Sequence, residues 1–141
     1  MPYQMIYSSQ ANEPMTADSL EAILADARAG NEARGVTGAL VYVDGVFLQI
    51  LEGEKDVVVG LMSRIAQDAR HGAVKVFHEA EIDAPSFGSW RMAYLSASPE
   101  QVSAWAGLPG TATIEALLAD IGRAPRHAEQ MAASMLKALA G

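Results

Sequence analysis

A few polar side chains in this sequence stand where apolar residues would be expected. Gln49 lies within the hydrophobic stretch 46–53, and in an extended chain it shares one face with Phe47 and Leu51. A buried amide without hydrogen-bond partners costs about 1–3 kcal/mol. Gln49 therefore needs a partner, which could be a neighbouring side chain, a water molecule or a bound ligand.

Two helical patterns also carry polar groups on rows that otherwise face the core. Asn31 continues the row of Ile23 at helical spacing. On a second predicted helix, Arg64 and Asp68 accompany the apolar row of Ile65. If the two helices lie side by side on a sheet, these groups converge on one gap.

The remaining candidates lie on predicted strands or next to a helix. Tyr7 follows strand alternation near the N-terminus, and His71 comes directly after the second helical pattern. Trp90 and Met92 share a face of the last predicted strand. Phenol, amide, guanidinium and carboxylate groups around one gap suit a flat heterocycle with donors and acceptors along its edge. Ile23 and Ile65, one from each helix, would then sandwich its faces.

Each candidate also has a simpler interpretation. Asn31 could cap the end of its helix, because Asn is favoured there. Arg64 and Asp68 could form a surface pair one helical turn apart. An isolated His71 is usually structural, and Trp90 with Met92 is more often part of a core than of a ligand site. The conjunction of all these groups favours the ligand site.

The hydrophobic periodicity predicts the elements that would position these residues. Strand patterns cover residues 3–9, 37–43, 46–53, 74–82 and 87–95, and helical patterns cover residues 16–34 and 57–68. Asp44-Gly45 predicts a two-residue hairpin turn between two antiparallel strands. Asp18, with Glu21 after it, resembles a capping box at the start of the first helix.

This order predicts an α+β fold, a ferredoxin-like βαββαββ sandwich with two helices on one face of the sheet. We place this domain at residues 1–95 and a C-terminal helical extension at residues 96–141, because the composition changes to Ala, Leu and Met. Its two or three short helices could cover the second apolar face of the sheet. A homodimer contact is the rival cover, and the apolar second face of the sheet predicts a dimer.

Composition excludes several classes of function. The net charge of −7 argues against nucleic acid as a partner, since phosphate binding needs a basic surface. Cysteine is absent, and three scattered histidines offer no metal-ligand spacing: His71, His78 and His127. No signal peptide or apolar stretch of membrane-spanning length is present, so we expect a cytoplasmic protein without membrane contact.

Several motifs occur in order and together resemble the BLUF family, small blue-light sensors that use FAD. They are Tyr-x-Ser-x-Ala at 7–11, Ile-Leu-x-x-Ala-Arg-x-x-Asn at 23–31, Gly-Val-Thr-Gly-Ala-Leu-Val-Tyr at 35–42 and Gly-x-Phe-x-Gln-x-Leu-Glu-Gly at 45–53. Asp-Ala-Arg-His follows at 68–71 and Trp-Arg-Met at 90–92. The resemblance covers about residues 3–95.

The resemblance implies a photoreceptor that is not an enzyme, with non-covalent FAD, or FMN or riboflavin in its place. Gln49 would bridge Tyr7 and the flavin, and light would rearrange this hydrogen-bond network. The family's flavin contacts would fall on Tyr7, Ile23, Asn31, Gln49, Arg64, Ile65, Asp68 and His71. Trp90 and Met92 would relay the signal to a downstream protein that the sequence does not name.

Two positions depart from the family pattern. Arg91 stands between Trp90 and Met92 where a small residue is common, and Gly30 lacks a polar side chain that some members carry. One flavin contact is therefore expected to be missing.

Two other functions remain open at this point. A ferredoxin-like hydrolase of acylphosphatase type also needs an Arg and an Asn, but its glycine-rich phosphate loop is missing here. A pure dimerisation module would bind no small molecule.

Overall fold

The computed structural model describes residues 2–11, 16–67, 71–84, 92–108, 113–123 and 125–140. The strands in these ranges are β1 (Tyr3–Ala11), β2 (Thr37–Val43), β3 (Val46–Gly53), β4 (His71–Glu81) and β5 (Ala93–Ser96). The helices are α1 (Ala17–Arg34), α2 (Lys55–Ala66), α3 (Pro99–Trp105), α4 (Ile114–Ile121) and α5 (Pro125–Ala140). The predicted ferredoxin-like order and the C-terminal helical extension are confirmed.

One five-stranded sheet organises the molecule, with the strand order β4-β1-β3-β2-β5. Neighbouring strands are antiparallel except for β2 and β5, which run parallel. The register places Tyr7 of β1 directly opposite Gln49 of β3, and Leu40 of β2 on the other side of Gln49. The candidate residues on separate strands therefore meet at the centre of the sheet.

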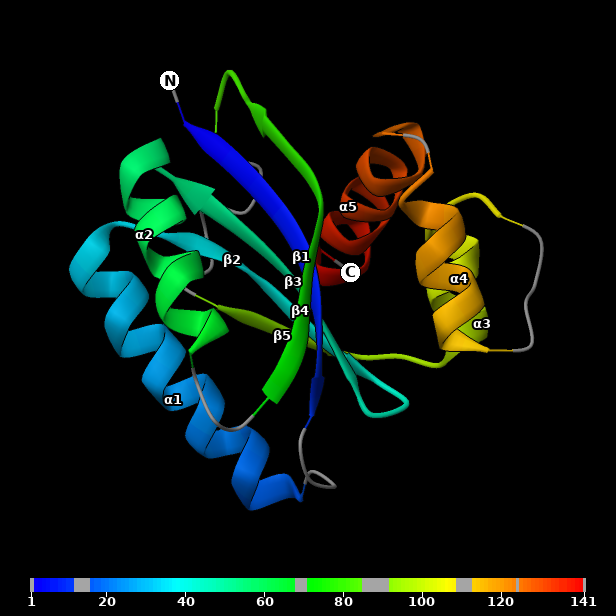
Figure 1. Ribbon diagram of the computed structural model, residues 1–141, viewed down its shortest axis with the longest axis horizontal. Coiled ribbons are helices and arrows are strands. Elements are labelled where there is room, and N and C mark those ends of the chain that lie inside the picture. The colour runs from blue at the N-terminus through cyan, green and yellow to red at the C-terminus, as the bar shows by residue number, and fades with distance from the viewer. Residues whose placement is uncertain are drawn as a thin grey trace.

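The two faces of the sheet are covered by different helices. Figure 1 shows α1 and α2 on one face and α5 on the other, with α3 and α4 beyond α5. On the α5 face, Leu48 and Ile50 of β3 belong to the same buried core as Met131 and Met135 of α5. The expectation that the C-terminal helices cover the second face is confirmed.

Local sequence chemistry sets the turns and helix ends. Asp44 and Gly45 both have positive φ, 52° and 80°, as the expected two-residue hairpin turn requires. The cap of helix α1 is Thr16, two residues before the predicted cap: the Thr16 hydroxyl accepts a hydrogen bond from the Ser19 amide at 3.1 Å. The assignment of Asp18 as the cap is therefore wrong, because Asp18 lies inside the first turn of the helix. Its negative charge interacts favourably there with the positive end of the helix dipole.

The strands at the two sheet edges differ from the sequence prediction. β4 begins at His71 rather than at residue 74, and its pairing with β1 shifts register twice. Such irregularities break the two-residue alternation by which a strand is recognised. Of the predicted strand 87–95, the described part contributes β5 from Ala93 onward, and residues 87–91 lie outside the described residues.

Candidate functional site

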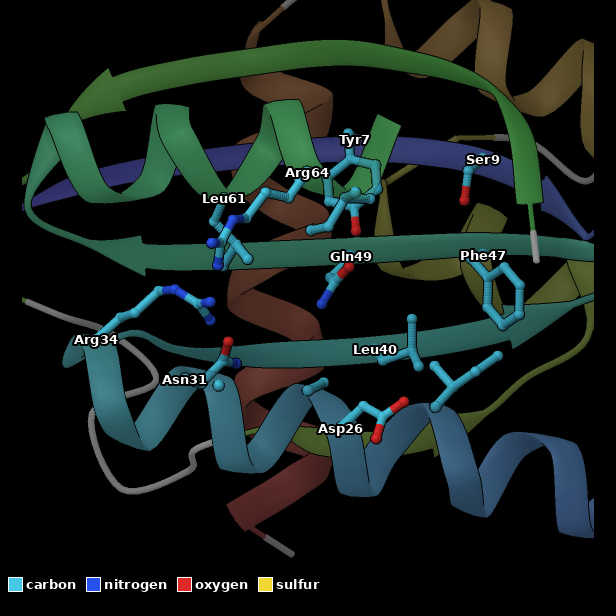
Figure 2. A pocket seen from close by; sticks show the side chains of 14 residues that line it. Tyr7, Ser9, Asp26, Asn31, Arg34, Leu40, Phe47, Gln49, Leu61 and Arg64 are labelled. Atoms are coloured by element: carbon cyan, nitrogen blue, oxygen red, sulfur yellow. The ribbon is translucent and has the colours of Figure 1, made fainter. Parts of the chain in front are cut away.

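A cavity of about 220 Å³ lies between α1, α2 and the sheet. Figure 2 shows side chains from both helices and from the strands beneath them pointing into it. Its lining comprises Tyr7, Ser9, Ile23, Asp26, Ala27, Gly30, Asn31, Arg34, Leu40, Phe47, Gln49, Leu61, Arg64 and Ile65. Helical periodicity brings the α1 and α2 residues here, because both helices turn one face to the sheet.

Tyr7 and Gln49 form the floor of the cavity. They are paired across β1 and β3, and their exposed fractions are only 1% and 8%. In Figure 2 the Tyr7 hydroxyl and the Gln49 amide point toward the same part of the cavity. The Gln49 amide nitrogen also lies 3.5 Å from the Met92 sulfur, to which it donates a weak hydrogen bond.

Met92 connects this floor to the last strand of the sheet. Its side chain is buried, and it directly precedes β5. Its backbone carbonyl accepts a hydrogen bond from Nε of Arg28 on α1 at 3.0 Å. Met92 is therefore held at two points, by Arg28 at its backbone and by Gln49 at its sulfur.

Asn31 is a cavity residue and does not cap its helix. It lies inside α1 with 2% of its surface exposed, while Gly35 takes the left-handed position at the helix end, with φ of 70°. The backbone carbonyl of Asn31 accepts the Val36 amide at 2.9 Å, which closes the helix end. The simpler interpretation of Asn31 as an end cap is therefore wrong.

Two guanidinium groups line the cavity, one from each helix. Arg34 extends from the last turn of α1 and Arg64 from α2. Among the residues that the structure describes, neither side chain has a hydrogen-bond or ion-pair partner. Two unpaired cations beside a polar cavity favour a ligand that offers hydrogen-bond acceptors or negative charge.

The structure brings most of the predicted site residues together. Tyr7, Ile23, Asn31, Gln49, Arg64 and Ile65 all line the cavity. Asp68 and Trp90 lie outside the described residues, so the surface pairing of Arg64 with Asp68 stays a prediction. His71 is the first residue of β4, paired with Ala11, and its side chain is also outside the description.

Sequence reasoning missed two charged residues of the cavity, Asp26 and Arg34. The helical pattern over residues 16–34 places Arg34 only at a helix end, although Arg34 stands one turn after Asn31 on the same side of the helix. Asp26 stands one turn after Ile23 in the same way. Helical spacing from an already suspected residue could have identified both.

Two tyrosines outside the cavity have raised pKa values. The Tyr3 hydroxyl donates to Glu79, and this hydrogen bond, together with burial and the nearby acids, raises the pKa of Tyr3 to about 12. Burial, followed by the neighbouring Tyr42, raises the pKa of Tyr94. Neither residue lines the cavity, so these two phenols have no direct part in its chemistry.

Comparisons with known proteins show which proteins this chain resembles. The family model for BLUF, sensors of blue light using FAD, matches residues 3–93. Photoactivated adenylate cyclase subunit beta of Euglena gracilis is 45% identical over 78 residues, which cover 55% of this chain and 9% of that protein. The chain thus spans less than a tenth of the length of this curated relative.

Solved structures match over nearly the whole chain. The ground state of BlsA is 31% identical, with a TM-score of 0.69 over 88% of this chain and 89% of that one. The dark state of BlrB, a BLUF protein, has a TM-score of 0.77 over 97% and 96% of the two chains. At 22% identity, the BlrB match supports the fold alone. The hydrolase alternative finds no support in these comparisons.

Proposed function

Because this chain belongs to the BLUF family of blue-light sensors that use FAD, we propose that Tyr7 and Gln49 are its photochemical switch, beneath a flavin ring held between α1 and α2. The observation that carries the proposal is their pairing across β1 and β3 on the floor of the cavity. The neighbouring side chains would supply apolar surface and hydrogen-bond donors to the ring.

The cavity residues fit the ring system of a flavin in their chemistry. The cavity volume of about 220 Å³ is larger than the roughly 150 Å³ that holds the single ring of benzene. Ile23 and Ile65 offer apolar surface to the faces of a flat ring. Asn31, Gln49 and Arg64 offer donors to its carbonyl and nitrogen edge. FMN and riboflavin carry the same ring and are proposed as substitutes.

The mechanism uses the chemistry of the two floor residues. Bound FAD would supply the absorption of blue light and an excited state that accepts an electron. Tyr7 is a phenol, which can release an electron and then its hydroxyl proton. The Gln49 amide has both donors and acceptors, so rotation or tautomer change alters its hydrogen bonds without moving charge. Because a net hydrogen bond contributes only about 0.5–1.5 kcal/mol, the two arrangements differ little and revert thermally.

Met92 is the proposed route out of the site. A reoriented Gln49 amide would lose or change its 3.5 Å contact with the Met92 sulfur. Met92 precedes β5, which pairs with β2 and leads to α3. The output is then a population shift of β5 and the helices that follow it. Trp90 is also proposed to take part in this relay, but it lies outside the residues that the structure describes.

We extend only the sensing role of the relatives to this chain. The Euglena relative is a photoactivated adenylate cyclase, and this chain matches a small part of it. We propose that this chain is itself no enzyme and acts on a separate effector protein. A homodimer and a cytoplasmic location stay predictions. No described helix has the length and apolarity to cross a membrane.

Absorption spectroscopy of purified protein tests the function. The protein should be yellow with FAD bound, and blue light should shift its absorption bands slightly to longer wavelength, with recovery in the dark. A colourless protein that takes up no flavin would overturn both the site and the mechanism.

Arg28→Met should make dark recovery about tenfold faster, the effect of a barrier lowered by roughly 1.4 kcal/mol. The substitution removes the hydrogen bond to the Met92 carbonyl, so Met92 can move more freely beside Gln49. The measurement is the rate at which the dark spectrum returns after illumination. Arg126→Met, an exposed position on α5, is the matched control. Equal recovery in Arg28→Met and the unchanged protein would contradict the role of Arg28.

A further inference from the structure

Gly30 and Arg34 are one helical turn apart on α1, and both line the cavity. A Cβ atom at residue 30 would lie 2.5 Å from Nη1 of Arg34, which is closer than real Cβ contacts allow. The Arg34 side chain therefore folds back over the backbone of Gly30. Figure 2 shows its guanidinium reaching from the end of α1 toward the middle of the cavity, on the side of Asn31.

Glycine is an unfavourable residue for a helix interior, and α1 and α2 each contain one, Gly30 and Gly60. Gly60 on α2 provides a comparison, because a Cβ there would meet nothing within 4 Å. At Gly30 the space is filled by the end of a charged side chain. With a Cβ at this position, the Arg34 guanidinium would have to leave the place that it occupies in the structure.

We propose that Gly30 and Arg34 act as a pair, in which the glycine admits the guanidinium and the guanidinium binds the carbonyl edge of the flavin ring. The proposal rests on flavin occupying the cavity. Among the described residues, the Arg34 guanidinium has no hydrogen-bond or ion-pair partner, and its side chain is half-buried. This supports the proposal, because a hydrogen-bond acceptor of a ligand would give the cation a partner.

The ring edge is favoured over the phosphate groups of the cofactor by the polarity of the cavity. Figure 2 places Asn31, Arg34 and Arg64 near one end, and Phe47 and Ser9 near the other. The flavin ring has the same asymmetry, with carbonyl and imide groups at one end and methyl groups at the other. Arg34 would thus replace the polar side chain that is absent at residue 30.

A cation at this edge should also change the redox property of the bound ring. Reduced flavin is richer in electrons than oxidised flavin, so a nearby guanidinium stabilises the reduced form more. Arg34→Met should therefore lower the midpoint reduction potential of the bound flavin. A tenfold change in the relative affinity for the two forms corresponds to about 30 mV for two electrons.

The test combines Arg34→Met, Gly30→Ala and the double variant in a thermodynamic cycle. Dissociation constants for riboflavin, FMN and FAD are measured by quenching of flavin fluorescence, and the midpoint potential is measured by dye-coupled reduction. Arg34→Met should weaken all three flavins by a similar factor, about tenfold in each case, as expected for one charge-assisted hydrogen bond. Gly30→Ala should weaken them severalfold alone and have no further effect in the Arg34→Met background.

Gly60→Ala is the matched glycine control and should leave flavin affinity unchanged. Unchanged riboflavin affinity in Arg34→Met, or a loss confined to FMN and FAD, would overturn the proposal, the second result by assigning Arg34 to phosphate. Additive effects of the two substitutions would overturn the pairing. All three results leave the light-sensing function intact, whereas failure of the unchanged protein to bind any flavin would overturn both this proposal and the light-sensing function.

Discussion

Replacing Tyr7 with phenylalanine should leave a yellow, FAD-bound protein that no longer shows the red shift under blue light. The variant keeps the aromatic ring of a residue that is buried in the core beneath α1 and α2, and it loses only the hydroxyl. The bound flavin should therefore stay in place. The light response needs a phenol that gives up an electron and a proton next to Gln49. Phenylalanine has no hydroxyl proton, and its ring is much harder to oxidise than a phenol.

Gln49→Leu should give the same result by a different route. Leucine fills a similar volume between Tyr7 and Leu40 but has no amide to reorient. Both variants are measured as light-minus-dark difference spectra, with the bound flavin quantified by its absorbance.

Tyr42→Phe is the matched control for the loss of a phenol. Tyr42 lies on β2, packs against Phe47 with ring centroids 5.2 Å apart, and does not line the cavity. This variant should keep the full red shift. A normal light cycle in either Tyr7→Phe or Gln49→Leu would show that the switch has been assigned to the wrong residues.

Gly38→Ala should destabilise the fold by about 3 kcal/mol, the upper end of the usual cost of overpacking. A Cβ at Gly38 of β2 would lie 1.9 Å from the backbone oxygen of Ile50 on β3. Backbone atoms cannot move aside as a flexible side chain can, so β2 and β3 must separate and weaken their hydrogen bonds. Since domains of this size are stable by only about 5–15 kcal/mol, the loss is a large share of the total.

Urea unfolding followed by circular dichroism measures this effect. Gly60→Ala is the control, because its new Cβ meets nothing, and it should stabilise α2 by about 0.5–1 kcal/mol. Since β2 also contributes Leu40 to the cavity, Gly38→Ala should weaken flavin binding as well. A Gly38→Ala protein as stable as the unchanged one would mean that the two strands are not packed as described.

Much of the site was readable from the sequence because it depends on local periodicity. The alternation of residues 46–53 placed Gln49 with Phe47 on one face, and both line the cavity. Helical spacing did the same for Ile23 and Asn31. The hairpin at Asp44 and Gly45 followed from turn chemistry, which needs only two residues. The Thr16 cap was missed because Thr and Asp are both good caps, and the choice depends on where the helix starts.

The sequence by itself determined the order and type of the elements and which side chains share a face, because those properties repeat within a few residues. Only the tertiary structure decided how distant segments meet: Tyr7 opposite Gln49, Met92 held between Arg28 and Gln49, and Arg34 folded over Gly30. Strand register and side-chain conformation are chosen by contacts between residues far apart in the chain. Such contacts leave no periodic trace in the sequence, since their energies depend on three-dimensional packing.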